Sequence, residues 1–176
     1  EKCKYGMTFP KDYNVVNSLT GAYLIMKETT DKNGKCILES CSQASIANSL
    51  MDMATLGLNA SKKQGYFIAY GGKCQFQKSY FGNITLARRN GLKTINAEII
   101  YDGDTFKYHI ENGMKVIDVH EQDFMNIDND KILGAYAVAV MDDGRKVVEV
   151  MNINQLKKAW NQRTGGLKED ASSTHM

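Results

Sequence analysis

Two spacings of apolar residues occur along this chain and divide it into a helical first part and a strand-rich second part. Apolar residues recur every three or four positions over 12–28 and 42–56, which is the period of an amphipathic helix. From residue 65 onward the period is mostly two, which is typical of a strand with one buried face. The pattern therefore predicts helices first and strands afterwards.

Turn and cap residues set the limits of these elements. Asn33-Gly34 marks a turn after the first helix, and Ser42 is placed to cap the second. Gly71-Gly72 separates two short alternating runs and predicts a tight hairpin. The predicted elements are helices over 12–28, 42–56, 79–90 and 152–160, and strands over 65–70, 73–78, 92–101, 105–110 and 114–120.

The segment GAYAVAVMDDGRKVVEVM, residues 134–151, predicts a further hairpin. Two β-branched runs flank Asp143-Gly144, a pair typical of a type I′ turn. Asn152 then stands where a residue would cap the last predicted helix.

The order of elements predicts the α+β class, with N-terminal helices preceding a mostly antiparallel sheet that has a helix packed across it. No internal repeat or linker is visible, so we expect one core domain over 1–163 and a loop or disordered tail over 164–176. The start, EKCKYG, lacks the apolar segment of a signal peptide. No stretch approaches the about 18 apolar residues of a membrane-spanning helix.

Charge is divided unevenly along the chain, although the formal net charge is only +2. From Met53 to Ala97 there is no Asp or Glu, and these 45 residues carry a local net charge of +7. The remaining residues therefore carry −5. The stretch 98–130 is the acidic counterpart, with nine acids against Lys107 and Lys115.

Aromatic residues recur at short intervals within the acid-free stretch. Cations attract phosphate and rings stack on unpaired bases, so the combination is typical of sequence-independent binding of single strands. A purely structural interpretation also fits, with the rings in the core and the lysines on a solvated face. The candidate phosphate contacts are Lys73, Lys78, Arg88, Arg89 and Lys93, with Lys62 and Lys63 as second choices, and the stacking candidates are Tyr80 and Phe81.

The two stacking candidates differ in their expected exposure. Helical spacing places Tyr80 on the inward face with Ile84, and Phe81 on the neighbouring face. Tyr66 and Phe67 point to opposite faces of their strand, so only one of them can be buried in a one-sided sheet.

Motifs of nucleotide-dependent catalysis are missing. The sequence contains no G-x-x-x-x-G-K-[ST], no G-x-G-x-x-G between a strand and a helix, and no G-x-S-x-G. None of the four cysteines stands in a C-x-x-C pair, and we expect them to be free in a reducing compartment. We therefore expect no cofactor, no use of ATP, and no Mg²⁺ requirement from any motif.

The acidic stretch leaves a nuclease open, because nucleases hold Mg²⁺ with carboxylates. Against it, Glu149-Val150-Met151 has methionine where a restriction-like Glu-x-Lys would have lysine. His120 is interpreted as a surface histidine at a strand end. The carboxylates that would have to cluster are Asp102, Asp104, Asp118, Asp123 and Glu149.

An ordered set of motifs runs through the middle of the chain. SIANSLMDMATLGL is followed by GYFIAY, by KCQF, and by a helix that ends near Arg89-Asn90-Gly91. The later members of the set are Tyr80, Gly82, Ala97, Tyr101, Asp104, Phe106, Tyr108 and the hairpin 134–151. In this order they resemble the RecT family of phage and prophage single-strand annealing proteins, over residues 42–160. The chain departs from the family pattern at Ala69 (proline in the family), Ser79 (glycine) and Phe81 (lysine).

The resemblance implies a non-enzymatic protein that binds single-stranded DNA and anneals complementary strands without ATP in phage-type homologous recombination and DNA repair. It also implies binding of the annealed duplex, self-association into a ring or helical filament, a partner exonuclease, no membrane, and a cytoplasmic location in a bacterial host. Family members are longer at both ends, so we expect further N-terminal and C-terminal parts. The charge division suggests that the acidic 98–130 of one subunit meets a basic surface of the next.

Three other functions stay open from the sequence. The alternative is a Mg²⁺-dependent, structure-specific nuclease that uses the acidic stretch 98–130. An RNA-binding stacking module would use the same rings and cations. A phage factor that binds a host protein would instead turn the basic patch toward an acidic protein partner.

Overall fold

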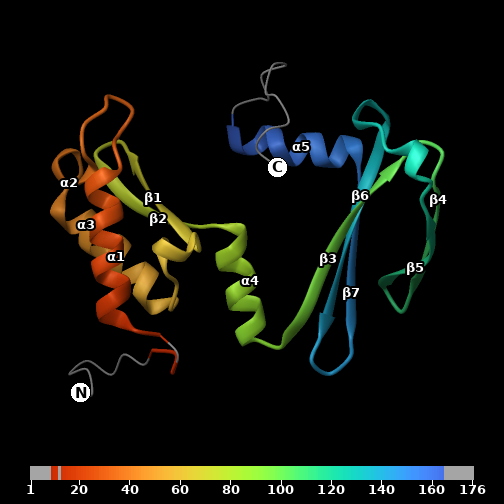
Figure 1. The fold of residues 1–176 in the computed structure, drawn as a ribbon, viewed down its shortest axis with the longest axis horizontal. Helices are drawn as coiled ribbons and strands as arrows, with labels where there is room; N and C mark the ends of the chain where they lie inside the picture. The colour runs from red at the N-terminus through yellow and green to blue at the C-terminus, as the bar shows by residue number, and fades with distance from the viewer. Residues whose placement is uncertain (1–8, 12, 165–176) are drawn as a thin grey trace. The chain divides into compact units, whose positions relative to one another are not determined.

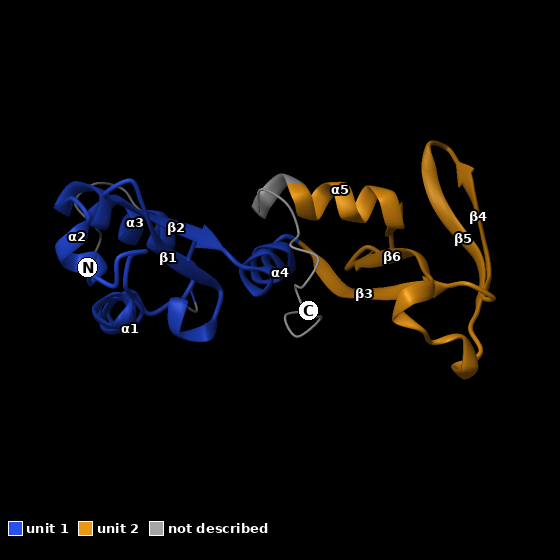
Figure 2. Ribbon diagram, turned by 90° about the horizontal axis from the view of Figure 1, so that it is seen from above, with its two compact units in different colours: residues 1–90 blue, residues 91–176 orange. Residues whose placement is uncertain are grey.

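The computed structural model describes residues 9–11 and 13–164 of the 176-residue chain (Figure 1). Its internal contacts divide it into two compact units, residues 1–90 and 91–176 (Figure 2), and each unit is described by itself. The expectation of one core domain over 1–163 stays a prediction. The expected tail over 164–176 lies outside the described residues, apart from Thr164, which ends the last helix.

Helices precede antiparallel strands, which confirms the α+β prediction. Within the described residues the strands form three antiparallel sheets. Their strand orders are β1 (Gly65–Tyr70)-β2 (Lys73–Lys78), β3 (Leu92–Tyr101)-β6 (Ile132–Met141)-β7 (Lys146–Asn152) and β4 (Thr105–Glu111)-β5 (Met114–Glu121). None of the described helices is long and apolar enough to cross a bilayer.

The described part of unit 1 consists of four α-helices, the short turn η1 (Ala60–Lys62) and one hairpin. The helix predicted from Ser42 is present, and the Ser42 hydroxyl accepts a hydrogen bond from Ser45 N–H at 3.4 Å. A one-turn helix after Cys36 is an element that the sequence analysis did not predict. The elements are α1 (Val15–Glu28), α2 (Ile37–Ser40), α3 (Gln43–Thr55), η1 (Ala60–Lys62), β1 (Gly65–Tyr70), β2 (Lys73–Lys78) and α4 (Tyr80–Arg89).

The β1–β2 hairpin has one face in the core of unit 1. Phe67 and Cys74 are buried on that face, and the rings of Phe67 and Phe76 lie 5.3 Å apart. The core continues into the helices through Ala22, Met26, Ile37, Met53 and Leu58. Gly71 and Gly72 both have positive φ, +57° and +75°, as a two-residue type I′ turn requires, so the predicted tight hairpin is confirmed.

Unit 2 is a three-stranded sheet with a second hairpin and a C-terminal helix. The helix α5 contacts β6 and β7. Asn152 Oδ1 accepts a hydrogen bond from Gln155 N–H at 2.9 Å, so the predicted cap is confirmed. The elements are β3 (Leu92–Tyr101), β4 (Thr105–Glu111), β5 (Met114–Glu121), η2 (Phe124–Asn126), η3 (Asn129–Lys131), β6 (Ile132–Met141), β7 (Lys146–Asn152) and α5 (Ile153–Thr164).

The turn between β6 and β7 differs from the predicted type I′. Gly144 has φ +85°, but Asp143 does not have a positive φ, and type I′ needs both. The Gly144 N–H donates to Met141 O at 2.9 Å, and Met141 N–H donates to Arg145 O at 2.8 Å. This pattern is that of a longer hairpin turn, in which a glycine with a positive φ forms a β-bulge. Asp143 Oδ1 favours it by accepting a hydrogen bond from Arg145 N–H.

Candidate nucleic-acid interface

The outward side of the β1–β2 hairpin is exposed and carries rings and amides. Strand alternation turns Tyr66, Ile68 and Tyr70 away from the core, and the three are 52%, 39% and 77% exposed. The register places them opposite Gln77, Gln75 and Lys73 on β2, which are also exposed. We call these six residues the hairpin face: Tyr66, Ile68, Tyr70, Lys73, Gln75 and Gln77.

The hairpin face has no acidic residue, and one strand differs from the other. The β1 side is apolar and aromatic, whereas the β2 side offers two amides and one ammonium group. Tyr66 and Tyr70 are four positions apart on one strand, about 13 Å at the usual rise. Two bases stacked directly on each other are about 3.4 Å apart, so each ring would hold a separate base rather than neighbouring bases of one stack. The face can therefore stack on unpaired bases while its amides and lysine hydrogen-bond to polar groups.

A second exposed aromatic pair lies at the start of α4. Tyr80 and Phe81 are 63% and 56% exposed, and their ring centroids are 5.8 Å apart in an edge-on arrangement. The Ser79 hydroxyl accepts a hydrogen bond from Gly82 N–H and donates one to Lys63 O at 2.6 Å, which ties the backbone of Lys63 to the residue directly before Tyr80. We call Lys62, Lys63, Tyr80 and Phe81 the α4 face.

Tyr80 corrects an expectation, because the sequence placed it inward. The buried residue of α4 is Gly82, and a Cβ there would collide with the carbonyl oxygen of Gln64. That close approach makes the Gly82 side of the helix its packed side. Tyr80 is two residues away, about 200° around the helix, and therefore points to solvent. Phe81 is exposed as expected.

The predicted cations do not share one surface. Lys73 lies on the hairpin face, whereas Lys78 has the opposite strand parity and lines a surface pocket with Asp52 and Phe76. Arg88 is exposed in the last turn of α4. Lys93 belongs to unit 2, where it lies in an irregularity of β3 between Leu92 and Thr94.

Arg89 has a structural role in unit 1. Its guanidinium donates to Leu56 O at 3.0 Å and to Gly57 O at 2.9 Å, which satisfies carbonyl groups at the C-terminal end of α3. These bonds use two of the five N–H donors of the guanidinium. DNA binding by Arg89, as by the other predicted residues, stays a prediction.

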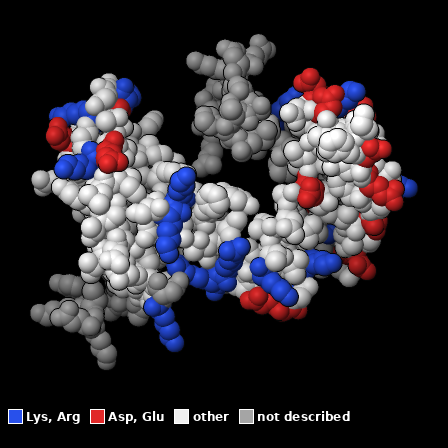
Figure 3. Space-filling model, viewed as in Figure 1, with Lys and Arg blue, Asp and Glu red and all other residues white. Residues whose placement is uncertain are grey.

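Figure 3 shows the charge division on one face of the molecule. Blue Lys and Arg atoms run along part of unit 1 without red atoms between them, whereas red atoms recur across unit 2. In sequence, the acid-free part of unit 1 extends from Met53 to Asn90.

The carboxylates proposed for a nuclease are engaged separately. Asp118 lies 2.8 Å from His109 Nδ1, and Glu149 lies 2.6 Å from Lys115 Nζ. In the part of the chain that the structure describes, no three His, Cys, Asp or Glu side chains come together as a metal site would require. The described residues thus contain no carboxylate cluster that would support the nuclease alternative.

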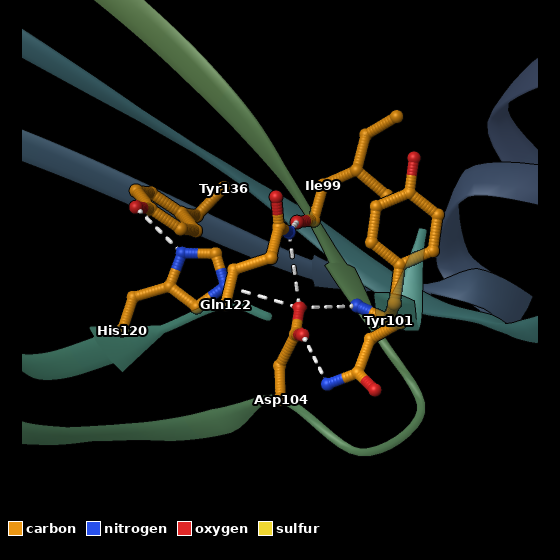
Figure 4. Close-up of polar contacts among 7 residues, drawn as sticks. Ile99, Tyr101, Asp104, His120, Gln122 and Tyr136 are labelled. Atoms are coloured by element: carbon orange, nitrogen blue, oxygen red, sulfur yellow. Dashed lines mark hydrogen bonds and ion pairs between the residues drawn. The ribbon is translucent and has the colours of Figure 1, made fainter. Parts of the chain in front are cut away.

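Asp104 is the centre of a buried polar network, drawn in Figure 4. Its side chain is fully buried, and that of His120 is 10% exposed, so the expectation of a surface histidine is wrong. The hairpin β4–β5 places His120 against Asp104, a packing contact that residue order alone does not reveal. The donors to the carboxylate are Tyr101 N–H at 2.9 Å, Gln122 Nε2 at 3.1 Å, His120 Nε2 at 3.3 Å and Asn126 Nδ2 at 3.3 Å.

The network keeps Asp104 ionised. Burial raises the pKa of the carboxyl group, but the four hydrogen bonds outweigh burial and lower the pKa from 3.8 to about 2. With His120 Nε2 as the donor to Asp104, Nδ1 accepts a hydrogen bond from the Tyr136 hydroxyl at 3.1 Å. Burial, aided by Glu98, raises the pKa of Tyr136, so this hydroxyl keeps its proton. These hydrogen bonds link β3, β5 and β6, so the arrangement favours a structural role.

Comparison with known proteins decides the family. The model of the RecT family matches residues 19–174. The chain belongs to the RecT family. It is also similar to the uncharacterized protein YqaK of Bacillus subtilis (strain 168), at 33% identity over 144 residues, which covers 78% of this chain and 49% of that protein. The chain therefore spans about half the length of this curated relative. RecT proteins are single-strand annealing proteins of DNA recombination in a phage and prophage context.

Most of the hairpin face was not among the contacts predicted from the sequence. Lys73 was predicted, whereas Tyr66, Ile68, Tyr70 and the two glutamines were not. A local signal was available, because a two-residue Gly-Gly turn fixes the register and hence the residues that share the free face. The lysines were predicted from their charge, whereas the residues of the hairpin face are defined by the alternation of side chains along a strand.

Proposed function

We propose that this chain forms the single-strand-binding part of a non-enzymatic protein that anneals complementary DNA strands without ATP, in the cytoplasm of a bacterial host. The observation that carries the proposal is the hairpin face, an exposed and acid-free surface with two tyrosines, an isoleucine, two amides and a lysine. Membership in the RecT family supports it.

Annealing imposes two physical demands that the hairpin face can meet. Two like-charged backbones must approach each other, so cations must reduce their repulsion. The base edges must also stay free to pair, which stacking allows because a ring holds a base by its flat side. Tyr66 and Tyr70 would hold two bases while Lys73 contacts phosphate. None of these contacts reads sequence, as an annealing protein requires.

The remaining predicted cations would add affinity that depends on salt. Each phosphate contact on a single strand contributes about −0.7 to the slope of log affinity against log salt concentration. Five contacts would give a slope of about −3.5. The five candidates are the predicted cations of unit 1 other than Arg89, and all five are exposed: Lys62, Lys63, Lys73, Lys78 and Arg88. Arg89 and Lys93 are further candidates.

The wider assembly is also part of this proposal. Family membership supports self-association along DNA into a ring or filament, binding of the annealed duplex, and cooperation with an exonuclease that exposes single strands. No ATP or Mg²⁺ enters the proposed annealing step.

The test compares Tyr66→Ala/Tyr70→Ala with Tyr108→Ala. Tyr108 is also an exposed strand tyrosine, 45% exposed, but it lies on β4. Loss of two stacked rings should weaken binding of a fluorescent oligothymidine at least tenfold, because each base-ring stack contributes about 1–3 kcal/mol. The Tyr108 variant should bind as the parent chain does.

The same variants are tested for annealing of two labelled complementary oligonucleotides without ATP. We expect the double variant to anneal more slowly and the Tyr108 variant to match the parent. Equal binding by all three chains would contradict the hairpin face as the interface. Cleavage of the strands after addition of Mg²⁺ would favour the nuclease.

A further inference from the structure

Unit 2 presents two large apolar side chains almost wholly to solvent. Phe124 and Met125, on the short turn η2, are 82% and 83% exposed, the highest values among the exposed large apolar residues of the described chain. We call this pair the apolar knob. Leaving both side chains in water forgoes the stabilisation that their burial would give, so the knob suits a surface that is covered in an assembly.

The turn that carries the knob is held in place from both sides. Asp123 caps it, with its Oδ1 accepting from Met125 N–H at 2.9 Å and its carbonyl accepting from Asn126 N–H at 2.9 Å. Gln122 before the turn and Asn126 at its last position both donate to the buried Asp104. The network of Figure 4 thus fixes the two ends of the knob. A preorganised turn loses little conformational entropy when a partner binds.

The charge around the knob identifies the chemistry of its partner. Glu121, Asp123, Asp128 and Asp130 surround it in sequence, and no Lys or Arg occurs between Lys115 and Lys131. Acidic surroundings repel nucleic acid, so an apolar wedge between bases is disfavoured here. The matching partner is a protein surface that combines apolar rings with cations and lacks acids.

The α4 face of this same chain has that chemistry. Tyr80 and Phe81 are exposed rings, and no acid occurs from Met53 to Asn90. Lys62 and Lys63 are exposed, and the Lys63 carbonyl is bonded to Ser79, directly before Tyr80. We propose that the apolar knob of one copy docks on the α4 face of a second copy, with Phe124 and Met125 against the two rings and the flanking acids toward the lysines. Because the two surfaces differ, the contact is head-to-tail and can extend to a third copy.

In associated copies this proposal assigns the α4 face, with Lys62 and Lys63, to protein contact, so these two lysines would contact phosphate only in the dissociated chain. The hairpin face is left for DNA in both states, so failure of one proposal does not imply failure of the other. The first measurement is the mass distribution of the 176-residue chain by sedimentation velocity over a range of concentrations, without DNA. Phe124→Ser/Met125→Ser should raise the concentration of half-association about a hundredfold or more, because two buried apolar side chains are lost. Unchanged thermal unfolding of the variant shows that it is folded.

A matched control uses exposed apolar residues elsewhere in unit 2. Ile110→Ser/Met114→Ser removes side chains that are 68% and 58% exposed near the β4–β5 turn, and it should associate as the parent chain does. An equal loss of association in both variants would overturn the assignment to the knob. A parent chain that stays monomeric at every concentration would overturn the proposal itself.

Mixing tests the second half of the contact. Tyr80→Ser/Phe81→Ser keeps the knob but removes the rings of the α4 face, whereas the knob variant keeps the rings. Neither variant should associate alone, and an equimolar mixture should form a dimer and no longer species, because only one contact remains possible. Failure of the mixture to dimerise would overturn the proposed pairing. The proposal would also be overturned if Tyr80→Ser/Phe81→Ser associated as the parent chain does but, when dilute, bound oligothymidine more weakly than the parent.

Discussion

The hairpins β1–β2 and β4–β5 use similar turns but are held by different forces. Gly71 and Gly72 turn the first with φ of +57° and +75°, and Asn112 and Gly113 turn the second with +50° and +79°. The first hairpin buries Phe67 and other residues of its inner face, whereas no residue of β4 or β5 is buried. The two hairpins thus have similar turns, but the first is anchored by apolar contacts and the second mainly by polar contacts.

The second hairpin is tied to its sheet mainly through polar groups, beside one aromatic contact in which the ring of Phe106 stacks on that of Tyr136 at 5.4 Å. His120 and Gln122 donate to Asp104, and Lys115 contacts Glu149 on β7 at 2.6 Å. Hydrophobic anchoring needs only one face of a two-stranded sheet, so the hairpin face of β1–β2 is left for a ligand. Polar anchoring depends on the ionisation of one carboxylate. The comparison therefore predicts that the two hairpins respond to different changes.

The largest expected effect is loss of the apolar anchor. Phe67 is 3% exposed and packs on Phe76, so Phe67→Ala should lower the free energy of unfolding by about 3–5 kcal/mol. Tyr108→Ala on the exposed β4 should cost about 1 kcal/mol or less. Urea denaturation of both variants checks this. Similar losses at both sites would show that the hairpins are anchored alike.

The next effect depends on pH and concerns the polar anchor. The pKa of Asp104 is lowered from 3.8 to about 2, so its stabilising contribution is complete above about pH 4 and is lost as the pH falls toward about 2. Asp104→Asn should destabilise unit 2 at pH 7, and the difference from the parent chain should shrink between about pH 4 and pH 2. Thermal unfolding at several pH values measures it.

Asp102→Asn is the matched control for Asp104→Asn. Asp102 lies in the same loop, but it is exposed. Its variant should follow the parent chain over the whole pH range. If Asp104→Asn also ran parallel to the parent between pH 4 and pH 2, the carboxylate would not be the polar anchor.

A smaller effect is expected from the turns. Gly72 has φ +75° and no atom closer than 3.9 Å to an added Cβ, so Gly72→Ala meets backbone strain rather than a clash. We expect a loss of about 1–2 kcal/mol in the free energy of unfolding. Asn112 already adopts a positive φ, and Asn112→Gly should change stability by less than about 0.5 kcal/mol. Chemical denaturation that ranks these two variants in the reverse order would contradict the shared turn geometry.

The smallest effect is expected at the ion pair between β5 and β7. Lys115 and Glu149 have side chains 29% and 66% exposed, so water screens their attraction. Lys115→Met should therefore cost about 0–1 kcal/mol, and added salt should reduce the difference from the parent chain. Thermal unfolding in low and high salt measures this, and a large, salt-independent loss would show that the hydrogen bond from Lys115 Nζ to Val150 O at 3.2 Å, rather than the ion pair, ties the strands.

Local patterns were enough to predict the first hairpin. The period-two runs and the Gly-Gly turn gave 65–70 and 73–78, the bounds that the structure has. The cap at Ser42 and the helix after Asn152 were also local features and were confirmed. These elements are decided by residues a few positions apart, so the chain order alone contains the information.

Features that depend on distant packing could not be predicted. Tyr80 is exposed because Gly82 lets α4 approach Gln64, a contact across 18 positions. Asp104 collects donors from residues 101, 120, 122 and 126, which meet only once β4 and β5 have paired. The apolar knob lies in a segment without periodicity, so neither its exposure nor its support was visible in the sequence.

The uninterrupted absence of acids from Met53 to Asn90 has a consequence for control of the protein. This segment also contains no histidine, and lysine and arginine generally stay protonated well above neutrality. The electric field of this surface should thus be nearly constant across the acidity that living cells experience. The ionic strength of the medium, rather than its pH, is therefore expected to control how strongly this surface binds a ligand.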